Sequence, residues 1–255
     1  KVVAMIAPAI EGQFPGSLGQ IKAALKKAGF AEVVEVAEGA EVTAKKEAEE
    51  LAEKLEEGAG FMTTSCCPAW MQLIENHIPY LKTKSSDTLS PMGYTAQICK
   101  ERWPEYKTVF IGPCLAKRIE AAKKFRSTID GVITYSELAA IFVGKDIDVR
   151  EMEDEDLGAT DSFQDCREFA LTQGTAGCVM SRFEKKGENV RVLPINGLDK
   201  KTVRLMKTWE KRAPEADLVE VMCCEGGCIA GPGTIVKPQL AIKLREAARK
   251  AKAAK

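Results

Sequence analysis

Histidine is almost absent from this sequence, which has one histidine and nine cysteines among its 255 residues. Zinc sites usually draw their cysteines as close Cys-x-x-Cys pairs and often add a histidine. Here the cysteine motifs are widely separated along the chain. The composition therefore disfavours zinc and favours a metal group that thiolates alone bind.

Long apolar runs, an excess of charge and a glycine-rich phosphate loop are also missing. The longest apolar runs, such as residues 2–7 and 138–143, are far shorter than the about 18 residues that span a bilayer. Lysine and arginine together number 37, as do aspartate and glutamate, so no net field attracts nucleic acid. No signal peptide is recognisable and the many thiols suit a reducing compartment, so we expect a soluble, cytoplasmic protein without nucleic-acid or membrane partners.

Apolar, β-branched runs alternate with helical patterns along the whole chain. Predicted strands cover residues 1–6, 32–36, 60–64, 107–111, 131–134, 189–194 and 217–222. Predicted helices cover residues 17–28, 41–56, 71–76, 95–103, 136–143, 199–211 and 237–252. This rhythm predicts an α/β fold of mostly parallel sheet flanked by helices, in one domain or two lobes.

Three cysteine motifs follow three of these predicted strands. They are TSCCPAW at residues 64–70, GPCLAK at 112–117 and CCEGGC at 223–228. In parallel sheets ligands bind beyond the carboxyl ends of strands, so the motifs are expected to converge. Together they supply four candidate soft-metal ligands, two of them from the last motif. A cubane takes four thiolates, so iron–sulfur chemistry is the leading prediction.

Disulfides are the main alternative for the cysteines. Nine is an odd number, and the chain is far larger than the small domains that disulfides staple together. We therefore expect no disulfides, and we assign Cys99, Cys166 and Cys178 to the core as buried free thiols. The acidic stretch at residues 146–161 is read as a solvated loop or connector, with metal binding as the alternative.

The motifs TSCCPAW, FIGPCLAKR and EVMCCEGGCIAG resemble the three signature segments of the [FeFe]-hydrogenase catalytic domain. The resemblance covers essentially the whole chain, and it implies a single catalytic domain over residues 1–255, with the cofactor in the cleft between two lobes. It implies that a [4Fe-4S] cubane is bound by Cys67, Cys114, Cys224 and Cys228. The last of these is also implied to bridge to a two-iron subcluster that carries CO, cyanide and a dithiolate.

The resemblance also implies a path for protons. Cys66 matches the proton donor to the distal iron, and a free thiol has a pKa of about 8.5, close to neutral pH. Glu47 and Glu50 lie three apart on one face of a predicted helix and match the relay glutamates, while Ser86 matches the relay serine. Without the resemblance, the two glutamates would be read as a solvated helix face.

The alignment of the relay leaves one choice open. Glu47 and Glu50 match only if the loop after their helix is one residue shorter than in the family. Counting back rigidly from Cys66 selects Lys46 and Glu49 instead.

Further positions match residues that surround the two-iron unit. Lys117 lies three residues after Cys114, in the first turn of an expected helix, where its ammonium can hydrogen-bond a cyanide ligand. Its alternative reading is a surface salt bridge. The other matching positions are Pro113, Met222, Ala7 and Pro8.

Several positions depart from the family pattern. Gly112 stands where methionine is usual, Met92 where glutamine is usual, and Pro232 interrupts a glycine run. These changes resemble divergent subgroups, some of which look like hydrogen sensors. Cys223 has no role in this interpretation.

The implied activity is the reversible reaction 2H⁺ + 2e⁻ ⇌ H₂. Two alternatives are a low-turnover hydrogen sensor with the same cofactor and an iron–sulfur assembly protein that holds only a cubane. The chain has no Cys-x-x-Cys-x-x-Cys-x-x-x-Cys-Pro run, so electrons are expected from a ferredoxin or an upstream iron–sulfur domain. Dedicated maturation enzymes are also implied. Lysines proposed to dock an acidic partner are Lys123, Lys124, Lys185 and Lys186.

Overall fold

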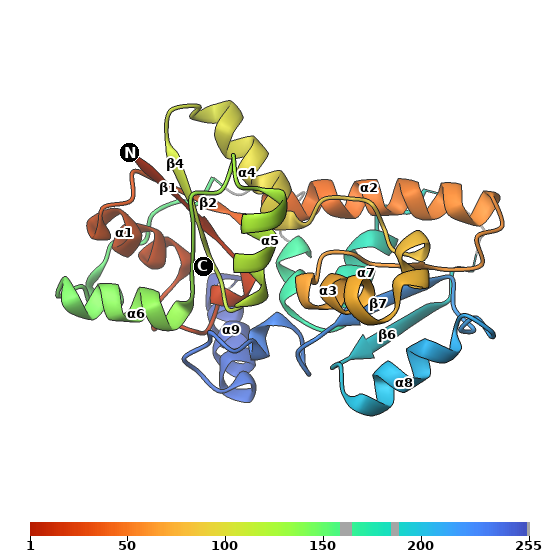
Figure 1. The fold of residues 1–255 in the computed structure, drawn as a ribbon. Helices are drawn as coiled ribbons and strands as arrows, with labels where there is room; N and C mark the ends of the chain where they lie inside the picture. Colours follow the sequence, from red (N-terminus) through yellow and green to blue (C-terminus); the bar gives the residue numbers. More distant parts are fainter. Residues whose placement is uncertain (159–164, 185–188, 254–255) are drawn as a thin grey trace.

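The computed structural model describes residues 1–158, 165–184 and 189–253, which form two lobes side by side (Figure 1). All seven predicted strands form, although β3 is shorter than expected and β6 begins later. They are β1 (Val2–Ile6), β2 (Glu32–Glu35), β3 (Met62–Thr63), β4 (Lys107–Ile111), β5 (Gly131–Ile133), β6 (Val192–Asn196) and β7 (Leu218–Met222).

The strands make two separate sheets, one in each lobe. The order is β2-β1-β4-β5 in the first sheet and β3-β7-β6 in the second, and every pair is parallel. Parallel neighbours need a crossover, which helices supply here. The predicted α/β fold, with two lobes of parallel sheet flanked by helices, is confirmed.

All seven helices predicted with bounds form in the described residues, together with α5, which was expected only from the position of Lys117, and α7. The helices are α1 (Leu18–Ala28), α2 (Val36–Glu56), α3 (Pro68–His77), α4 (Pro91–Arg102), α5 (Ala116–Lys124), α6 (Tyr135–Gly144), α7 (Gly174–Met180), α8 (Lys200–Thr208) and α9 (Pro238–Ala253). Helices α3 and α4 begin earlier than predicted, each at a proline. Proline suits the first helical turn, because an N–H at that position would have no acceptor within the helix and nothing is lost by its absence. Helix α7 was not predicted, because Gly174 and Gly177 weaken the helical signal.

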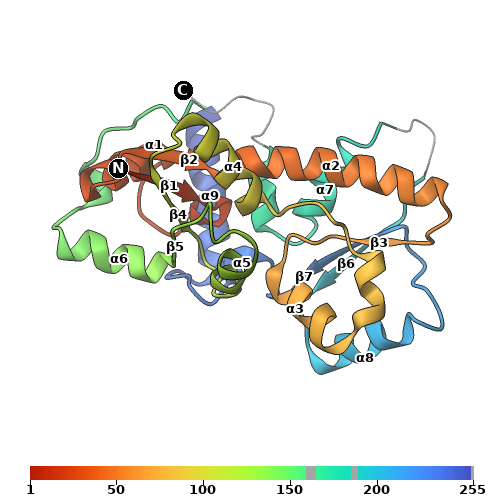
Figure 2. The same cartoon turned by 45° about the horizontal axis from the view of Figure 1, so that its top comes forward.

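Helices cover both faces of each sheet (Figure 2). In β1, Ala4 and Ile6 pack towards α1 and α6, whereas Val3 and Met5 pack towards α4 and α5. In β7, Leu218 packs towards α2 and α7, and the residues on the opposite face pack towards α3 and α8. Burial on both faces explains why the strands read as continuous apolar runs.

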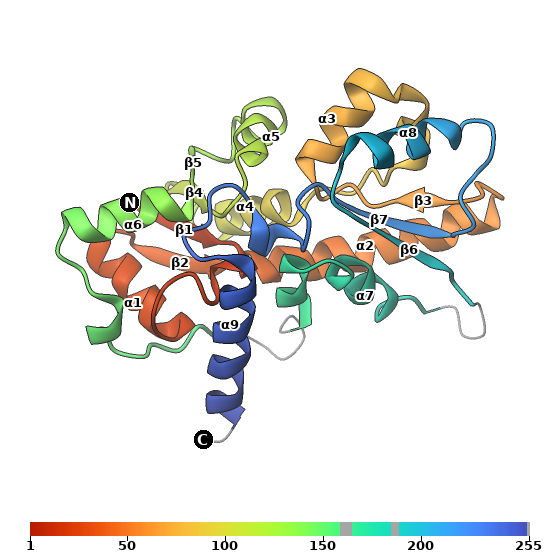
Figure 3. The ribbon, with the colours of Figure 1, turned by 90° about the horizontal axis from the view of Figure 1, so that it is seen from below.

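Helix α2 joins the two lobes (Figure 3). It packs on α4 in the four-stranded lobe and on α7 and the 3₁₀ helix η5 (Asp165–Ala170) in the three-stranded lobe. Gly39 allows the close approach to α4, because a Cβ there would lie 2.3 Å from the carbonyl oxygen of Pro91. The helix begins at Val36 rather than at residue 41, so its first turns reach back into the four-stranded lobe.

The prediction of no disulfides is wrong. Cys166 of η5 and Cys178 of α7 are buried and form a disulfide, with Cα atoms 5.9 Å apart. An odd cysteine count excludes only complete pairing, so one bridge leaves seven free thiols. Cys99 is fully buried in the core, as predicted.

The acidic segment runs along α1 as far as residue 158, and residues 159–161 lie outside the described part of the chain. Glu155 pairs with Lys26 at 2.6 Å, and the Ser17 hydroxyl donates to Asp154. These acidic side chains therefore serve a connector that contacts α1. Among the residues that the structure describes, no helix is long and apolar enough to cross a membrane.

Candidate metal centre

The three cysteine motifs meet at one cavity of about 180 Å³ between the two sheets. Each motif begins where a strand ends: the first follows β3, the second follows β4 and the third follows β7. Because β3, β4 and β7 end at the boundary between the two sheets, the motifs that follow them converge there, as predicted. The cysteines that line the cavity are Cys66, Cys67, Cys114, Cys223, Cys224 and Cys228.

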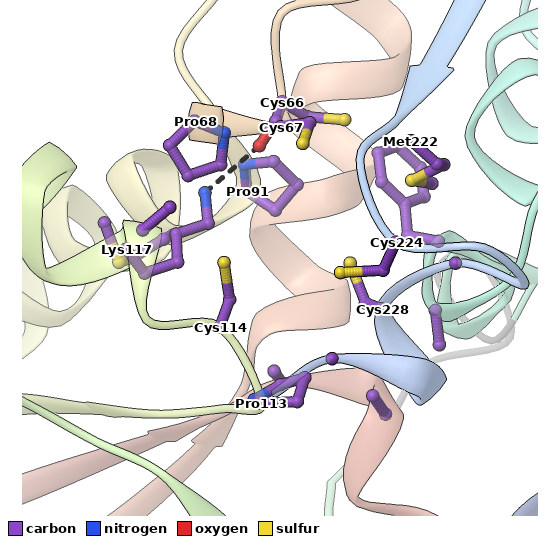
Figure 4. Close-up of a pocket in the computed structure, with 18 of the residues that line it drawn as sticks. Cys66, Cys67, Pro68, Pro91, Pro113, Cys114, Lys117, Met222, Cys224 and Cys228 are labelled. Carbon is purple, nitrogen blue, oxygen red and sulfur yellow. Dashed lines mark hydrogen bonds between the residues drawn. The ribbon is translucent and has the colours of Figure 1, made fainter. Parts of the chain in front are cut away.

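The four expected ligands turn their sulfur atoms towards a common space (Figure 4). A single tetrahedral zinc would hold four sulfurs about 3.8 Å apart, since the Zn–S bond is about 2.3 Å. Within the described residues, no three of these cavity thiols have sulfur atoms that all lie within 4.8 Å of one another. The wider spacing fits a multinuclear cluster better than one ion.

Burial makes free thiolates costly in this cavity. It raises the pKa of Cys66 and Cys67, and it raises the pKa of Cys228 to about 12. The value near 8.5 expected for Cys66 from its type therefore does not hold in the fold. Buried thiols with raised pKa values ionise far more readily when a bound cation stabilises their charge. Their number, direction and chemistry fit a cubane.

Two glycines shape the loop between Cys224 and Cys228. Gly226 and Gly227 have φ values of +93° and +94°, which L-residues with a Cβ rarely adopt. A Cβ on Gly227 would lie 2.7 Å from the carbonyl oxygen of Ala170. The glycines therefore let the loop turn tightly against η5, which also lines the cavity.

Lys117 lies in the first turn of α5, as predicted, and points into the cavity (Figure 4). Its Nζ donates to the Cys66 carbonyl oxygen at 3.2 Å and to Glu120 Oε2 at 2.6 Å. Burial alone would lower the pKa of Lys117, but Glu120 and the nearby Cys114 and Cys66 outweigh burial and raise it. The pair is buried, with 9% and 8% exposure, so the surface salt bridge expected as the alternative is not what forms.

Apolar residues make up the rest of the cavity wall. All four apolar positions named from the sequence lie there, namely Ala7, Pro8, Pro113 and Met222. Two of the departing residues, Met92 and Pro232, also line the cavity. Gly112 stands beside it, and a Cβ there would lie 2.5 Å from the Phe110 ring. Phe110 therefore fills the space that a larger residue at 112 would need.

The proposed relay residues lie side by side behind Cys66. Glu47 is fully buried, and its Oε1 accepts the Ser65 N–H at 3.2 Å. In the described residues its Oε2 has no hydrogen-bond partner. Burial raises the pKa of Glu47 to about 7. A carboxyl with such a pKa both accepts and gives protons near neutral pH.

Ser86 is hydrogen-bonded to Glu50. Its hydroxyl donates to Glu50 Oε2 at 2.6 Å. Partial burial would raise the pKa of Glu50, but hydrogen bonds from Ser86, Lys54 and Asp87 together lower it. Glu47 thus does not lie on a solvated helix face. The other alignment is disfavoured, because the side chains that it selects, Lys46 and Glu49, are both exposed.

Sequence reasoning missed three polar residues around the cavity. The Thr175 hydroxyl lies 3.8 Å from Cys66 Sγ. Glu220 is fully buried and accepts backbone N–H groups of Gln173 and Ala176, at 2.5 and 2.7 Å, which fixes the start of α7. Glu120, the partner of Lys117, had a signal in its i,i+3 spacing, whereas the other two are brought in from distant segments.

Two parallel sheets that meet at a cavity lined by six cysteines define an α/β protein with a thiol-rich centre between its lobes. The family model for the iron-only hydrogenase large subunit, C-terminal domain, matches residues 1–232. The chain therefore belongs to this family, and the resemblance seen in its motifs is confirmed.

Relatives among characterised proteins are distant. Iron hydrogenase 1 of Clostridium pasteurianum is 28% identical over 259 aligned residues, which cover 84% of this chain and 45% of that protein. The periplasmic [Fe] hydrogenase large subunit of Nitratidesulfovibrio vulgaris is 27% identical, with 93% of this chain and 69% of that protein covered. The chain thus spans about half the length of the clostridial relative.

Solved [FeFe]-hydrogenases share the fold. One, from work on oxygen inactivation of the H cluster, superposes with a TM-score of 0.77 at 22% identity, covering 97% of this chain and 83% of that chain. A variant of HydA1 from Chlamydomonas reinhardtii superposes with a TM-score of 0.72 at 23% identity, with the same coverage. At these identities the likeness establishes the architecture alone.

Proposed function

We propose that residues 1–255 form a single [FeFe]-hydrogenase catalytic domain that carries out 2H⁺ + 2e⁻ ⇌ H₂. The observation that carries this proposal is the convergence of four thiols from three strand ends in one apolar cavity, beside a buried carboxyl relay. When bound, the cubane would supply electrons, and the two-iron unit with its CO, cyanide and dithiolate ligands would supply the metal for the reaction.

The chain's own residues have separate tasks in this proposal. The cubane would be held by Cys67, Cys114, Cys224 and Cys228, with Cys228 proposed as the ligand shared with the two-iron unit. Lys117 donates a hydrogen bond to a cyanide, and Glu120 keeps its ammonium charged in a buried place. The apolar wall excludes water, which strengthens these polar contacts.

Protons move along a line of side chains away from the cavity. Cys66 would carry a proton at Sγ, and Glu47 would take it up at Oε2, which has no hydrogen-bond partner among the described residues. Ser86, which is hydrogen-bonded to Glu50, would complete the path between the two glutamates. Glu50 is half-buried and pairs with Lys54 at 2.9 Å, so we place the solvent end of the relay there.

Electrons would enter from a ferredoxin-like partner or an upstream iron–sulfur domain. Leu115 lines the cavity next to Cys114 and is 47% exposed, so the cubane would lie close to the surface at this point. Lys124 is exposed at the end of α5, the helix that follows Leu115, whereas Lys123 forms a salt bridge with Glu75 at 3.2 Å. Of the remaining proposed docking lysines, Lys185 and Lys186 lie outside the described residues.

The proposal includes dedicated maturation enzymes and a reducing, cytoplasmic compartment. Six of the seven free thiols surround the cavity, and free thiols of this kind suit a reducing compartment. The Cys166–Cys178 disulfide is not among the cysteines that line the cavity.

Infrared spectroscopy after maturation tests the proposal. The chain is co-expressed with hydrogenase maturation enzymes, and we expect CO and cyanide stretching bands together with steady-state hydrogen production. Cys114→Ala, matured in the same way, serves as the control without bands. Iron without these bands would instead indicate a protein that holds only a cubane.

A hydrogen sensor with the same cofactor is the second candidate function. The observation that favours it is the changed wall, where Met92, Pro232 and the Phe110 ring beside Gly112 surround the proposed two-iron site. Full infrared bands with hydrogen production far below that of a co-purified active relative would support the sensor.

A further inference from the structure

One pair of cysteines lies outside the metal cavity and has no part in the proposed function. Cys166 of η5 and Cys178 of α7 form a disulfide, while the six cavity cysteines are free thiols. Disulfides of proteins in a reducing compartment are usually transient and serve redox sensing or catalysis. In a compartment that suits the free cavity thiols, this bridge is therefore expected to form and open.

The two sulfur atoms of the bridge differ in their access to solvent. Cys166 is fully buried, whereas Cys178 lines a surface pocket of about 340 Å³. The pocket is also lined by Asp165 and Gly177, which are both exposed. A Cβ on Gly177 would meet nothing within 4 Å, so α7 leaves space beside the bridge. A small thiol that enters this pocket therefore meets Cys178 and not Cys166.

A guanidinium group lies against the accessible sulfur. Arg182 Nη1 donates to Cys178 Sγ at 3.2 Å, and the same side chain pairs with Asp165 and Glu41. A neighbouring arginine stabilises a cysteine as its thiolate, which is the reactive form in thiol–disulfide exchange. Once the bridge has opened, Arg182 therefore keeps Cys178 ready to form it again.

The bridge joins two segments that both reach the metal cavity. Phe169 and Ala170, at the end of η5, line the cavity, and Gly227 lies close to the Ala170 carbonyl oxygen. On the other side of the bridge, the hydroxyl of Thr175 in α7 lies 3.8 Å from Cys66 Sγ. A disulfide restricts the freedom of the segments that it joins. Opening the bridge would therefore give η5 and α7 more freedom beside the cavity.

We propose that Cys166 and Cys178 form a reversible redox site that a dithiol reductant reaches at Cys178 through the surface pocket. Opening of the bridge loosens η5 and α7, and with them the adjoining wall of the metal cavity. This inference goes beyond the proposed function and requires no bound cubane. It makes the redox state of a pair outside the cavity a control on the order of the cavity wall.

The reduction proceeds by two exchanges. One thiolate of the dithiol forms a bond to Cys178 Sγ, and the bond between the two cysteines breaks. Cys166 leaves as a thiolate and takes up a proton. The second thiolate of the dithiol then attacks its own sulfur in the mixed disulfide, which closes a cyclic disulfide and releases Cys178. Two electrons pass from the dithiol to the pair; one of its protons goes to Cys166 and the other to Cys178 or to water.

The first test is reduction of the folded full chain by dithiothreitol, without denaturant or metal. Alkylation followed by mass spectrometry counts the free thiols, and we expect the count to rise from seven to nine. Oxidised glutathione should then restore the cross-linked peptides of Cys166 and Cys178. A bridge that resists dithiothreitol in the folded chain would overturn the inference. If the purified chain already has nine free thiols, failure of oxidised glutathione to form the bridge would overturn it equally.

Two substitutions of one glycine test the route through the pocket. Gly177→Leu would occupy space beside Cys178, and we expect it to slow the reduction severalfold. Gly177→Ala is the matched control, because it favours the helix at least as much as leucine but adds little volume. Its reduction should remain much faster than that of the leucine variant. Equal rates in the two variants would contradict the pocket route, since the bridge would then open only through unfolding of α7.

Hydrogen exchange of the parent chain in its oxidised and reduced forms tests the effect on the cavity wall. We expect faster exchange after reduction in peptides that cover residues 165–180, including the Gln173 and Ala176 N–H groups that bond to Glu220. Peptides of β1 and β4, in the other lobe, serve as the internal control and should exchange at the same rate in both forms. Equal exchange of residues 165–180 in the two forms would overturn the proposed control of the wall. Faster exchange throughout the chain would also overturn it, because the bridge would then stabilise the whole fold and not this wall.

Discussion

The two lobes contribute to the cavity in unequal ways. The four-stranded lobe supplies one thiol, Cys114, together with Lys117 and much of the apolar wall. The other five cavity cysteines follow strands of the three-stranded sheet, and Ser86 is held there too, by an N–H bond of 2.8 Å to the Thr63 carbonyl oxygen. In the proposed function, the three-stranded lobe would therefore bind most of the cubane and carry the proton path, while the four-stranded lobe would close the cavity.

Cys114→Ala makes the strongest test of this division. Of the six cavity cysteines, Cys114 alone follows a strand of the four-stranded sheet. In this variant the three remaining ligands, Cys67, Cys224 and Cys228, all belong to the three-stranded lobe. We therefore expect the reconstituted variant to lose its cubane. Iron content and the absorption of the cluster measure the loss. The control is Cys99→Ala, which removes a thiol from the same lobe but outside the cavity lining, and full iron in the Cys114 variant would contradict the division.

Cys66→Ala tests the conducting role of the three-stranded lobe. Removing a proton carrier from its place typically costs about 10²- to 10⁴-fold in rate. We therefore expect hydrogen production to fall by about 10²-fold or more while the CO and cyanide bands persist. Both are measured on the same matured sample. Unchanged turnover would exclude Cys66 from the proton path.

Glu47→Gln tests the raised pKa of Glu47, on which the proposed relay depends, through its effect on the free energy of unfolding. The pKa of Glu47 is raised by burial from 4.5 to about 7. Below the unfolded value the carboxyl is neutral in both states, so its burial costs little. Between pH 4.5 and about 7 the unfolded chain ionises this carboxyl while the folded chain keeps it protonated, so the free energy of unfolding falls as pH rises to the folded pKa. The full difference is about 3 kcal/mol, from 1.36 kcal/mol per unit of pKa shift.

Because glutamine stays neutral, we expect Glu47→Gln to stabilise the chain more at pH 8 than at pH 5, by about 2–3 kcal/mol. Urea unfolding of the purified chain at the two pH values measures this. Glu49→Gln is the matched control, since it changes an exposed carboxyl on the same helix. An equal gain at both pH values would mean that the Glu47 carboxyl is not held in a costly environment.

How much of this site the sequence predicts depends on how local its contacts are. The strand ends and the cysteines beyond them follow from apolar runs and turn positions, so the cavity was predicted from its three motifs. The choice of Glu47 over Lys46 also had a local signal. In α2, Glu47 falls on the buried stripe of Ala40, Ala44 and Leu51, which has the spacing of a helix face.

Contacts between distant segments had no such signal. Thr175 contacts Cys66 across 109 positions of the chain. Glu220 caps α7, a helix that the sequence did not predict because its two glycines weaken the helical signal. The Cys166–Cys178 bridge depends on how η5 folds onto α7, with a separation of 12 residues that no motif marks. Such contacts are fixed by packing, which a one-dimensional pattern does not contain.

Gly112→Ala gives the smallest expected effect and sharpens the view of the four-stranded lobe as the closing wall. The added Cβ would lie 2.5 Å from the Phe110 ring and 3.1 Å from the Ala7 Cβ, and overpacking of this kind costs about 1–3 kcal/mol. Phe110→Leu removes the ring, so the double variant should recover part of that loss, as contacting residues couple in a double-mutant cycle. Urea unfolding of the three variants and the parent chain measures the coupling.

We expect iron content to stay at the parent level throughout, because neither residue is a ligand. Additive effects would mean that the ring does not occupy the space beside Gly112, and lost iron would mean that this wall helps to hold the cluster as well as to close the cavity.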